Sequence, residues 1–212
     1  MKPRVMLADD HRLLVEAFRK LLDPHYDVVG TVSDGCALVK SALLLKPDVV
    51  MIDIAMPLLN GLEAGRQLKR MMPSIKLVFL TMNHDSDLAA EAMRMGASGY
   101  LLKNSAASEL FQAIEEALKG RSYLTQQIAR EMQESFIRDP RPRNERSQLP
   151  TPRQREVIQL LVEGKTMKQA AHLLKLTPRT IAFHKYQLMD AMGLKTNADL
   201  VQFAIKNKII AT

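Results

Sequence analysis

The fold of this chain is decided by residues 47–61, which read PDVVMIDIAMPLLNG. The apolar run from Val49 to Ile52 is typical of a strand that is covered on both faces. Segments with helical periodicity separate it from comparable runs near residues 4–8, 27–32, 75–80 and 98–102. Five strands that alternate with helices predict an α/β domain with a doubly wound, five-stranded parallel sheet.

The apolar run from Val49 to Ile52 is followed directly by a carboxylate, Asp53. Polar residues also stand at the ends of other predicted strands. Asp9 and Asp10 follow the first strand, Thr81 ends the fourth, and Lys103 ends the fifth. Open α/β sheets bind their ligands at the carboxyl edge of the strands, so we expect these side chains to converge there.

Carboxylates, a hydroxyl and an ammonium in one crevice suit a divalent cation and a phosphoryl group. Mg²⁺ prefers oxygen ligands and binds through one or two carboxylates together with phosphate oxygens. An aspartate can itself be the nucleophile and form an aspartyl phosphate. Each aspartate taken alone would be read as a helix or turn cap, but five suitable residues at successive strand ends favour a site.

The C-terminal part has a different composition. A Pro- and Arg-rich segment, Asp139–Gln148, predicts a linker. Beyond it, short helical patterns near 152–163, 167–174, 178–191 and 197–207 predict a small all-α domain. Residues 1–128 carry equal numbers of basic and acidic side chains, so the whole formal charge of +7 lies in residues 129–212. This asymmetry predicts a polyanionic partner for that part, either nucleic acid or a membrane surface.

The helix predicted at 178–191 has an unusual outward face. At 100° per residue, Ile181 and Leu188 point inward, whereas Arg179, Phe183 and Tyr186 point outward. A helix of this kind in a DNA major groove can read bases through arginine and contact thymine methyl groups through Phe183 or Ala182. The same aromatic face could instead pack on a protein surface, so both partners stay open at this point.

Residues that could contact DNA phosphates surround this helix. They are Lys165, Thr166, Lys168, Lys175, Thr180 and Lys185, with Thr177 as the predicted N-cap.

Four segments of the first domain resemble a two-component receiver domain: ADD at 8–10, DIAMPLLNG at 53–61, LT at 80–81 and GASGYLLK at 96–103. The resemblance implies a flavodoxin-like fold and phosphorylation of Asp53. It also implies that Asp9, Asp10, Asp53 and the backbone carbonyl of Ala55 hold Mg²⁺.

The same resemblance implies that Thr81 and Lys103 bind the phosphoryl oxygens and that Tyr100 is the aromatic switch residue, which can otherwise be read as an ordinary edge-strand aromatic. One departure concerns access. Met82 follows the threonine where most receivers have Ala or Gly, so a phosphodonor would meet a narrower entrance.

The run from 149 to 208 resembles a LuxR-type helix-turn-helix, with TPR-x-RE at 151–156, EGKT at 163–166, TPRTI at 177–181 and GLKT at 193–196. Pro150, Met167, Gln169 and Ala170 depart from the usual residues. Together the two resemblances imply a NarL/FixJ-type response regulator. Its divisions are residues 1–122 for the receiver, 123–148 for a helical and Pro/Arg-rich linker, and 149–212 for the DNA-binding domain.

The combined prediction is a transcription factor whose binding to double-stranded DNA is controlled by phosphorylation of Asp53. The expected phosphodonor is a sensor histidine kinase or a small molecule, and the active form is expected to be a homodimer. The dimer contact is expected on the last helix, where Leu200, Phe203 and Ala204 form an apolar face that could equally be core.

A cytoplasmic location is expected, since the chain has a single cysteine, Cys36, no signal-peptide pattern and no membrane span. An enzyme is not expected beyond self-phosphorylation and dephosphorylation at Asp53. A dehalogenase-type phosphatase would need an acid at the position of Ala55, and nucleotide-binding glycine loops are missing. The remaining alternatives are a constitutive DNA-binding regulator with a degenerate receiver and a protein-interaction module.

Overall fold

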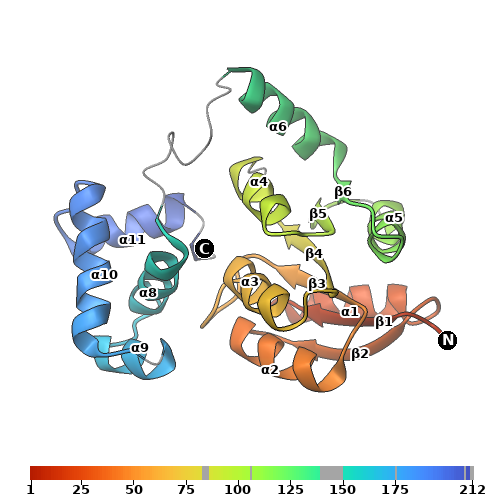
Figure 1. The fold of residues 1–212 in the computed structure, drawn as a ribbon, viewed down its shortest axis with the longest axis horizontal. Coiled ribbons are helices and arrows are strands. Elements are labelled where there is room, and N and C mark those ends of the chain that lie inside the picture. Colours follow the sequence, from red (N-terminus) through yellow and green to blue (C-terminus); the bar gives the residue numbers. More distant parts are fainter. Residues whose placement is uncertain (83–85, 106, 139–149, 175, 208, 211–212) are drawn as a thin grey trace.

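The computed structural model describes residues 1–82, 86–105, 107–138, 150–174, 176–207 and 209–210. The predicted linker Asp139–Gln148 and the predicted phosphate contact Lys175 lie outside these residues. In the described part, an α/β domain is followed by a helical domain, as Figure 1 shows. None of the described helices combines the length and the apolar character needed to cross a membrane.

Within the described residues, the first domain contains a parallel sheet of six strands in the order β2-β1-β3-β4-β5-β6. The strands are β1 (Arg4–Ala8), β2 (Asp27–Val32), β3 (Val49–Asp53), β4 (Lys76–Thr81), β5 (Gly99–Leu102) and β6 (Tyr123–Leu124). The predicted five strands are present, and β6 is an addition to the prediction. It pairs in parallel with β5.

Helices cover both faces of this sheet, and the apolar residues of each strand point alternately to the two sides. One core contains Met6, Ile52 and Phe79 from the strands, and the other contains Leu7, Met51 and Val78. The first is covered by α2 (Gly35–Leu45), α3 (Gly61–Met71), α4 (Ser86–Arg94) and α6 (Gln126–Arg138). The second is covered by α1 (Arg12–Leu22) and α5 (Ala107–Leu118).

Residues 123–138, which the sequence pattern assigns to a linker, begin by packing onto the first domain. Tyr123 pairs with Gly99 on the sheet edge, and Ile128 of α6 is fully buried in the first core. The segment that starts at 123 therefore belongs physically to the α/β domain up to at least Ile128.

The helical domain consists of α8 (Pro152–Val162), α9 (Met167–Leu174), α10 (Pro178–Ala191) and α11 (Asn197–Lys206). Threonines at three of the helix starts explain the sharp boundaries, because each hydroxyl accepts a hydrogen bond from a backbone N–H of the first turn. Thr151 caps α8, Thr177 caps α10 and Thr196 caps α11. All four predicted helices are present within two residues of the predicted bounds.

The segment after β3 returns directly over the end of that strand. Asn60 caps α3 by accepting a hydrogen bond from the backbone N–H of Glu63 at 3.0 Å, and Gly61 N–H donates to the carbonyl of Ile54 at 2.8 Å. A Cβ atom on Gly61 would lie 2.0 Å from the backbone oxygen of Asp53. Glycine at 61 thus allows the helix start to approach the strand end that carries Asp53.

We expect Gly61→Ala to destabilise the protein by about 1–3 kcal/mol or more, since the added methyl group would displace backbone. Gly30→Ala is the matched control. Its added Cβ would meet side-chain ends and no backbone atom, namely Leu45 Cδ1 at 2.7 Å and Met6 Cε at 4.0 Å. Urea unfolding of both variants measures the difference, and equal destabilisation would contradict the close approach at Gly61.

Candidate functional site

The predicted strand-end residues meet at the carboxyl edge of the sheet. Asp53 and Thr81 are the last residues of β3 and β4, whereas Asp9 and Lys103 immediately follow β1 and β5. All four are buried, with Asp53 2% exposed. The parallel arrangement of adjacent strands β1, β3, β4 and β5 explains this convergence, because every carboxyl end lies at the same edge.

Lys103 pairs with two of the carboxylates. Its Nζ lies 2.7 Å from Oδ2 of Asp9 and 2.9 Å from Oδ2 of Asp53. Burial raises the pKa of the Asp53 carboxyl above its ordinary value; the Lys103 ammonium opposes this shift and the neighbouring Asp9 adds to it. The site therefore holds more negative charge than one ammonium balances, which favours a bound cation.

His11 belongs to the same cluster, although the sequence pattern did not single it out. Its Nδ1 lies 3.0 Å from Oδ1 of Asp9, 2.9 Å from Oδ1 of Asp10 and 3.5 Å from Nζ of Lys103. Its side chain is 56% exposed, so it lies on the solvent side of the acidic cluster. The only feature of the sequence that indicates a role for His11 in this cluster is its position directly after Asp9 and Asp10.

The donor set fits a hard divalent cation. Ligand atoms of Asp9, Asp10, His11 and Asp53 all lie within 4.8 Å of one another. Oδ1 of Asp10 is a buried carboxylate oxygen that lies 2.9 Å from Nδ1 of His11, and a cation bound among these ligand atoms would balance its charge. An acidic cluster of this kind is typical of Mg²⁺ binding. Ala55, the predicted backbone ligand, donates its N–H to Oδ1 of Asp53 at 3.3 Å.

The two residues proposed to govern switching and access lie in contrasting environments. The Tyr100 side chain is fully buried within the first core. Met82, by contrast, is 67% exposed directly after Thr81. Its side chain is thus at the surface next to the pocket residues.

The outward face of α10 is arranged as the sequence pattern predicts. Phe183 is 60% exposed and Tyr186 is 57% exposed, whereas Ile181 and Leu188 are buried. Figure 1 shows α10 on the side of its domain that is turned away from the α/β domain. The predicted recognition face is therefore open in this conformation.

The remaining predicted DNA contacts lie around this face. Arg179, Thr177, Thr166 and Lys168 are exposed, whereas Thr180, Ala182 and Lys165 are half-buried. Some of the hydroxyls are already engaged. Thr177 Oγ1 accepts from the N–H of Thr180 at 3.2 Å, and Thr166 Oγ1 accepts from the N–H of Gln169 at 3.2 Å.

Lys185 is not placed as expected for a residue that contacts a DNA phosphate. It is buried, its Nζ donates to Oδ1 of Asn197 at 2.8 Å, and the ammonium lies 5.1 Å from the centre of the Tyr186 ring. In this conformation Lys185 ties α10 to the start of α11 and stacks under an exposed aromatic. It supports the recognition face from inside rather than extending it.

The apolar residues expected at a dimer contact on α11 form core instead. Leu200 and Ala204 are buried, and Phe203 packs against the same cluster. The large apolar side chains that α11 leaves exposed are Val201 and Ile205, at 38% and 41%.

Comparison with known protein families identifies both parts of the chain. Residues 5–115 match the model of the response regulator receiver domain. The chain belongs to the response regulator family. Residues 148–204 match the bacterial regulatory proteins of the luxR family, so this response regulator has the predicted receiver and helix-turn-helix architecture of a DNA-binding transcription regulator.

Two of the following relatives match this chain over nearly their whole length, and the third matches about two thirds of it. The oxygen regulatory protein NreC of Staphylococcus aureus is 29% identical over 98% of this response regulator and 99% of the relative. RcsB from Salmonella enterica serovar Typhimurium, solved bound to promoter rprA in the presence of phosphomimetic BeF₃⁻, is 25% identical with a TM-score of 0.66, covering 95% of this chain and 98% of that chain. A LuxR-family response regulator from Aurantimonas sp. SI85-9A1 is 34% identical with a TM-score of 0.62, covering 65% and 99%.

We expect Mg²⁺ to stabilise this response regulator by about 2.7 kcal/mol at a concentration of 100 times its Kd. Asp10→Asn should lose most of this gain because it removes one ligand charge, whereas Asp190→Asn, on the exposed side of α10, should keep it. Thermal unfolding with Mg²⁺ or with a chelator measures the gain, and full retention in Asp10→Asn would contradict this ligand set.

The stabilisation of the protein by Mg²⁺ should also depend on pH. Protons compete with Mg²⁺ for the Asp53 carboxylate, and the pKa of this carboxyl is raised by burial. The stabilisation by Mg²⁺ should therefore decline, as pH is lowered, at a higher pH than the ordinary aspartate pKa of about 3.9 would give. Repeating the thermal unfolding between pH 7 and pH 4, roughly the range that brackets these values, measures this decline.

Proposed function

We propose that this response regulator accepts a phosphoryl group on Asp53 with the help of Mg²⁺ and that this modification controls DNA binding by α10. The observation that carries the proposal is the buried carboxylate of Asp53, held 2.9 Å from the Lys103 ammonium beside Asp9 and Asp10. A nucleophilic carboxylate, a cation site and a fixed ammonium are the elements that phosphoryl transfer to an aspartate needs.

Each residue has a distinct role in the proposed reaction. Asp53 supplies the attacking oxygen, and Asp9, Asp10, Asp53 and the Ala55 carbonyl would hold Mg²⁺. The bound metal would neutralise charge on the transferring phosphoryl group. Lys103 already forms two ion pairs in the site, and its ammonium would bind an oxygen of the phosphoryl group. Thr81 would donate its hydroxyl to a phosphoryl oxygen, and Tyr100 would respond to the movement of Thr81.

DNA binding is proposed for the open face of α10. Arg179 would read base edges, and Phe183 and Ala182 would contact thymine methyl groups. Tyr186, supported by Lys185, would reach a base edge or a phosphate. Lys165, Lys168 and Thr166 would contact phosphates, together with the hydroxyls of Thr177 and Thr180.

The partners follow from the same scheme. Phosphoryl groups would come from a sensor histidine kinase or a small phosphodonor, and the active form would be a homodimer on double-stranded DNA. The site would act in the cytoplasm, where the DNA is, and it would carry out self-phosphorylation and dephosphorylation without turning over a further substrate.

Binding to a pool of random duplex DNA tests the proposal, with Mg²⁺ and with or without beryllofluoride as a phosphoryl mimic. The mimic should tighten selective binding by the wild type and leave Asp53→Ala unchanged. Selective binding that ignores both the mimic and Asp53 would indicate a constitutive regulator, which the intact acidic pocket disfavours. Absence of selective binding in every state would indicate a protein partner for the aromatic face of α10.

Two substitutions distinguish base reading from phosphate contact. Arg179→Ala should cost about 1–3 kcal/mol on the selected sequence and relax specificity. Lys168→Ala should weaken binding uniformly across sequences and reduce the salt dependence by about one ion. Titrations on selected and unrelated duplexes at several salt concentrations measure both effects, and identical behaviour of the two variants would argue against the proposed orientation of α10.

A further inference from the structure

The ring of His11 is held against the acidic cluster and takes no part in its own helix. His11 is the N-cap residue of α1, yet its side chain forms no capping hydrogen bond. Its backbone N–H donates to Oδ1 of Asp9 at 2.9 Å, and its Nδ1 lies 3.0 Å from the same oxygen. One carboxylate thereby positions both the backbone and the ring, so the imidazole stays at the cluster although much of the side chain is exposed.

Two carboxylate oxygens lie close to one nitrogen of this ring. Nδ1 of His11 is 3.0 Å from Oδ1 of Asp9 and 2.9 Å from Oδ1 of Asp10. Lys103 pairs with the Oδ2 atoms of Asp9 and Asp53, so the oxygens beside the imidazole are not those that the ammonium holds. Nδ1 carries at most one proton, and one N–H points well at one acceptor. A metal ion bound by the nitrogen and both oxygens would satisfy all three atoms.

The spacing of Nδ1 from these oxygens is that of neighbouring ligands on one ion. Ligand atoms that lie about 2.1 Å from an octahedral ion are about 3.0 Å apart when they are adjacent. Both separations from Nδ1 agree with this value, and ligand atoms of Asp9, Asp10, His11 and Asp53 all lie within 4.8 Å of one another. The imidazole nitrogen therefore stands among the carboxylate oxygens at the place where a cation is expected.

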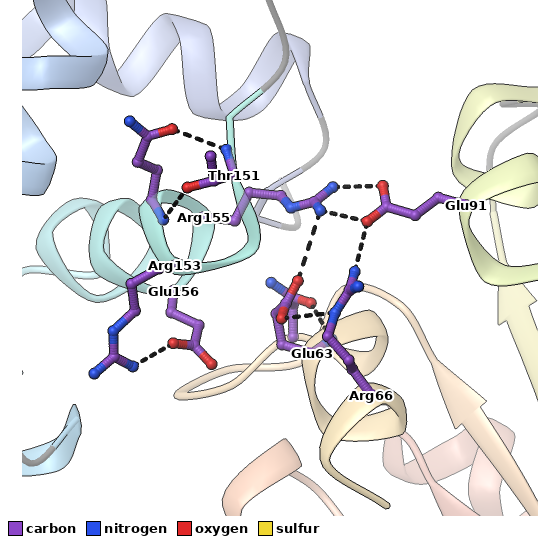
Figure 2. Close-up of polar contacts among 9 residues, drawn as sticks. Glu63, Arg66, Glu91, Thr151, Arg153, Arg155 and Glu156 are labelled. Carbon is purple, nitrogen blue, oxygen red and sulfur yellow. Dashed lines mark hydrogen bonds and ion pairs between the residues drawn. The ribbon is translucent and has the colours of Figure 1, made fainter. Parts of the chain in front are cut away.

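A cluster of charges between α3, α4 and α8 is balanced without an ion, as Figure 2 shows. Arg155 Nη1 lies 2.7 Å from Oε2 of Glu91, and Arg66 Nη2 lies 2.7 Å from Oε1 of the same carboxylate. Arg66 also pairs with Glu63, so two guanidinium groups face two carboxylates. At the sheet edge, by contrast, three carboxylates face one ammonium. Only the cluster that contains His11 thus retains negative charge for a cation.

A nitrogen ligand changes which ion such a site prefers. Mg²⁺ is a hard ion that takes oxygen ligands and gives up its waters reluctantly. First-row transition ions accept imidazole as well as carboxylate, and their affinity for mixed nitrogen and oxygen sites rises from Mn²⁺ onward along the series. An imidazole ligand therefore adds affinity for a transition ion and adds little for Mg²⁺.

We propose that His11 is a ligand of the divalent cation at the acidic cluster and that its nitrogen makes this site selective for a first-row transition ion over Mg²⁺. The inference rests on the cation site of the proposed function. Mg²⁺ still binds through the carboxylate oxygens, but a transition ion gains one further ligand. His11 is thus the residue that determines which of the two kinds of ion occupies the site when both are present.

Titration of the full chain with Mn²⁺ tests this selectivity, because the EPR signal of the free ion reports how much is bound. Competition with Mg²⁺ then gives the Mg²⁺ affinity of the same sample. His11→Ala should weaken Mn²⁺ binding by about tenfold or more, since even groups one step removed from a metal have effects of that size. Mg²⁺ binding should stay nearly unchanged. His172→Ala is the matched control, because His172 is an exposed histidine on α9 of the other domain.

Pulsed EPR of the bound Mn²⁺ identifies the ligand without any substitution. The wild type should show modulation from a directly bound ¹⁴N nucleus. This modulation should disappear in His11→Ala and persist in His172→Ala. The measurement distinguishes a coordinating imidazole from one that only donates a hydrogen bond to a neighbouring carboxylate.

The outcomes separate this inference from the proposed function. If His11 only donates to the carboxylates, His11→Ala frees their oxygens and tightens both ions, which refutes the inference. Equal weakening of Mn²⁺ and Mg²⁺, or bound Mn²⁺ without ¹⁴N modulation in the wild type, also refutes it and leaves the cation site in place. If the wild type binds neither ion, or Asp10→Asn binds both as the wild type does, the cation site of the proposed function is overturned as well.

Discussion

The structure of the receiver depends on one buried arrangement of charges, the Lys103 ammonium between the carboxylates of Asp9 and Asp53. These residues come from the ends of three strands, and their side chains are at most 3% exposed. Buried charges are tolerated when they are paired, so the lysine allows two acids to lie together at the sheet edge. The pairing is incomplete because Asp10 adds further negative charge. The same arrangement therefore leaves an excess of negative charge at the sheet edge, which suits a divalent cation.

Helix α8 has one face in the core of the DNA-binding domain and another face against the receiver. Val157, Ile158 and Leu160 of this helix are fully buried in the core of the DNA-binding domain. Gln159 and Arg155 lie on the receiver side and are also buried. Polar contacts of this kind are typical of interfaces between domains that can separate. The recognition face on α10 remains open meanwhile, so control in this conformation would act through the position of the domain and not by covering that face.

The number of basic residues in the C-terminal part overestimates how many of them are free to contact DNA. The excess positive charge lies in the C-terminal part, yet Lys185 is buried against Asn197, and Arg155 and Arg153 bind acidic side chains. Basic residues in a small domain serve its own packing as well as a polyanion. The open face of α10 carries aromatic surface, with Phe183 and Tyr186 as its exposed large hydrophobic side chains.

The sequence by itself determined the first five strands, the helices and the polar residues at the strand ends. Apolar periodicity and helix caps such as Thr151 and Thr177 are local properties, because they depend on residues a few positions apart. Tertiary structure alone decided the two-residue strand β6, which is too short to carry a period, and the position of His11 in the acidic pocket. It also decided the contact of Gln159 with the Asp53 loop, which joins residues about a hundred positions apart. The physical reason is that such contacts arise only when separate elements are packed together, and neighbouring residues in the chain carry no trace of them.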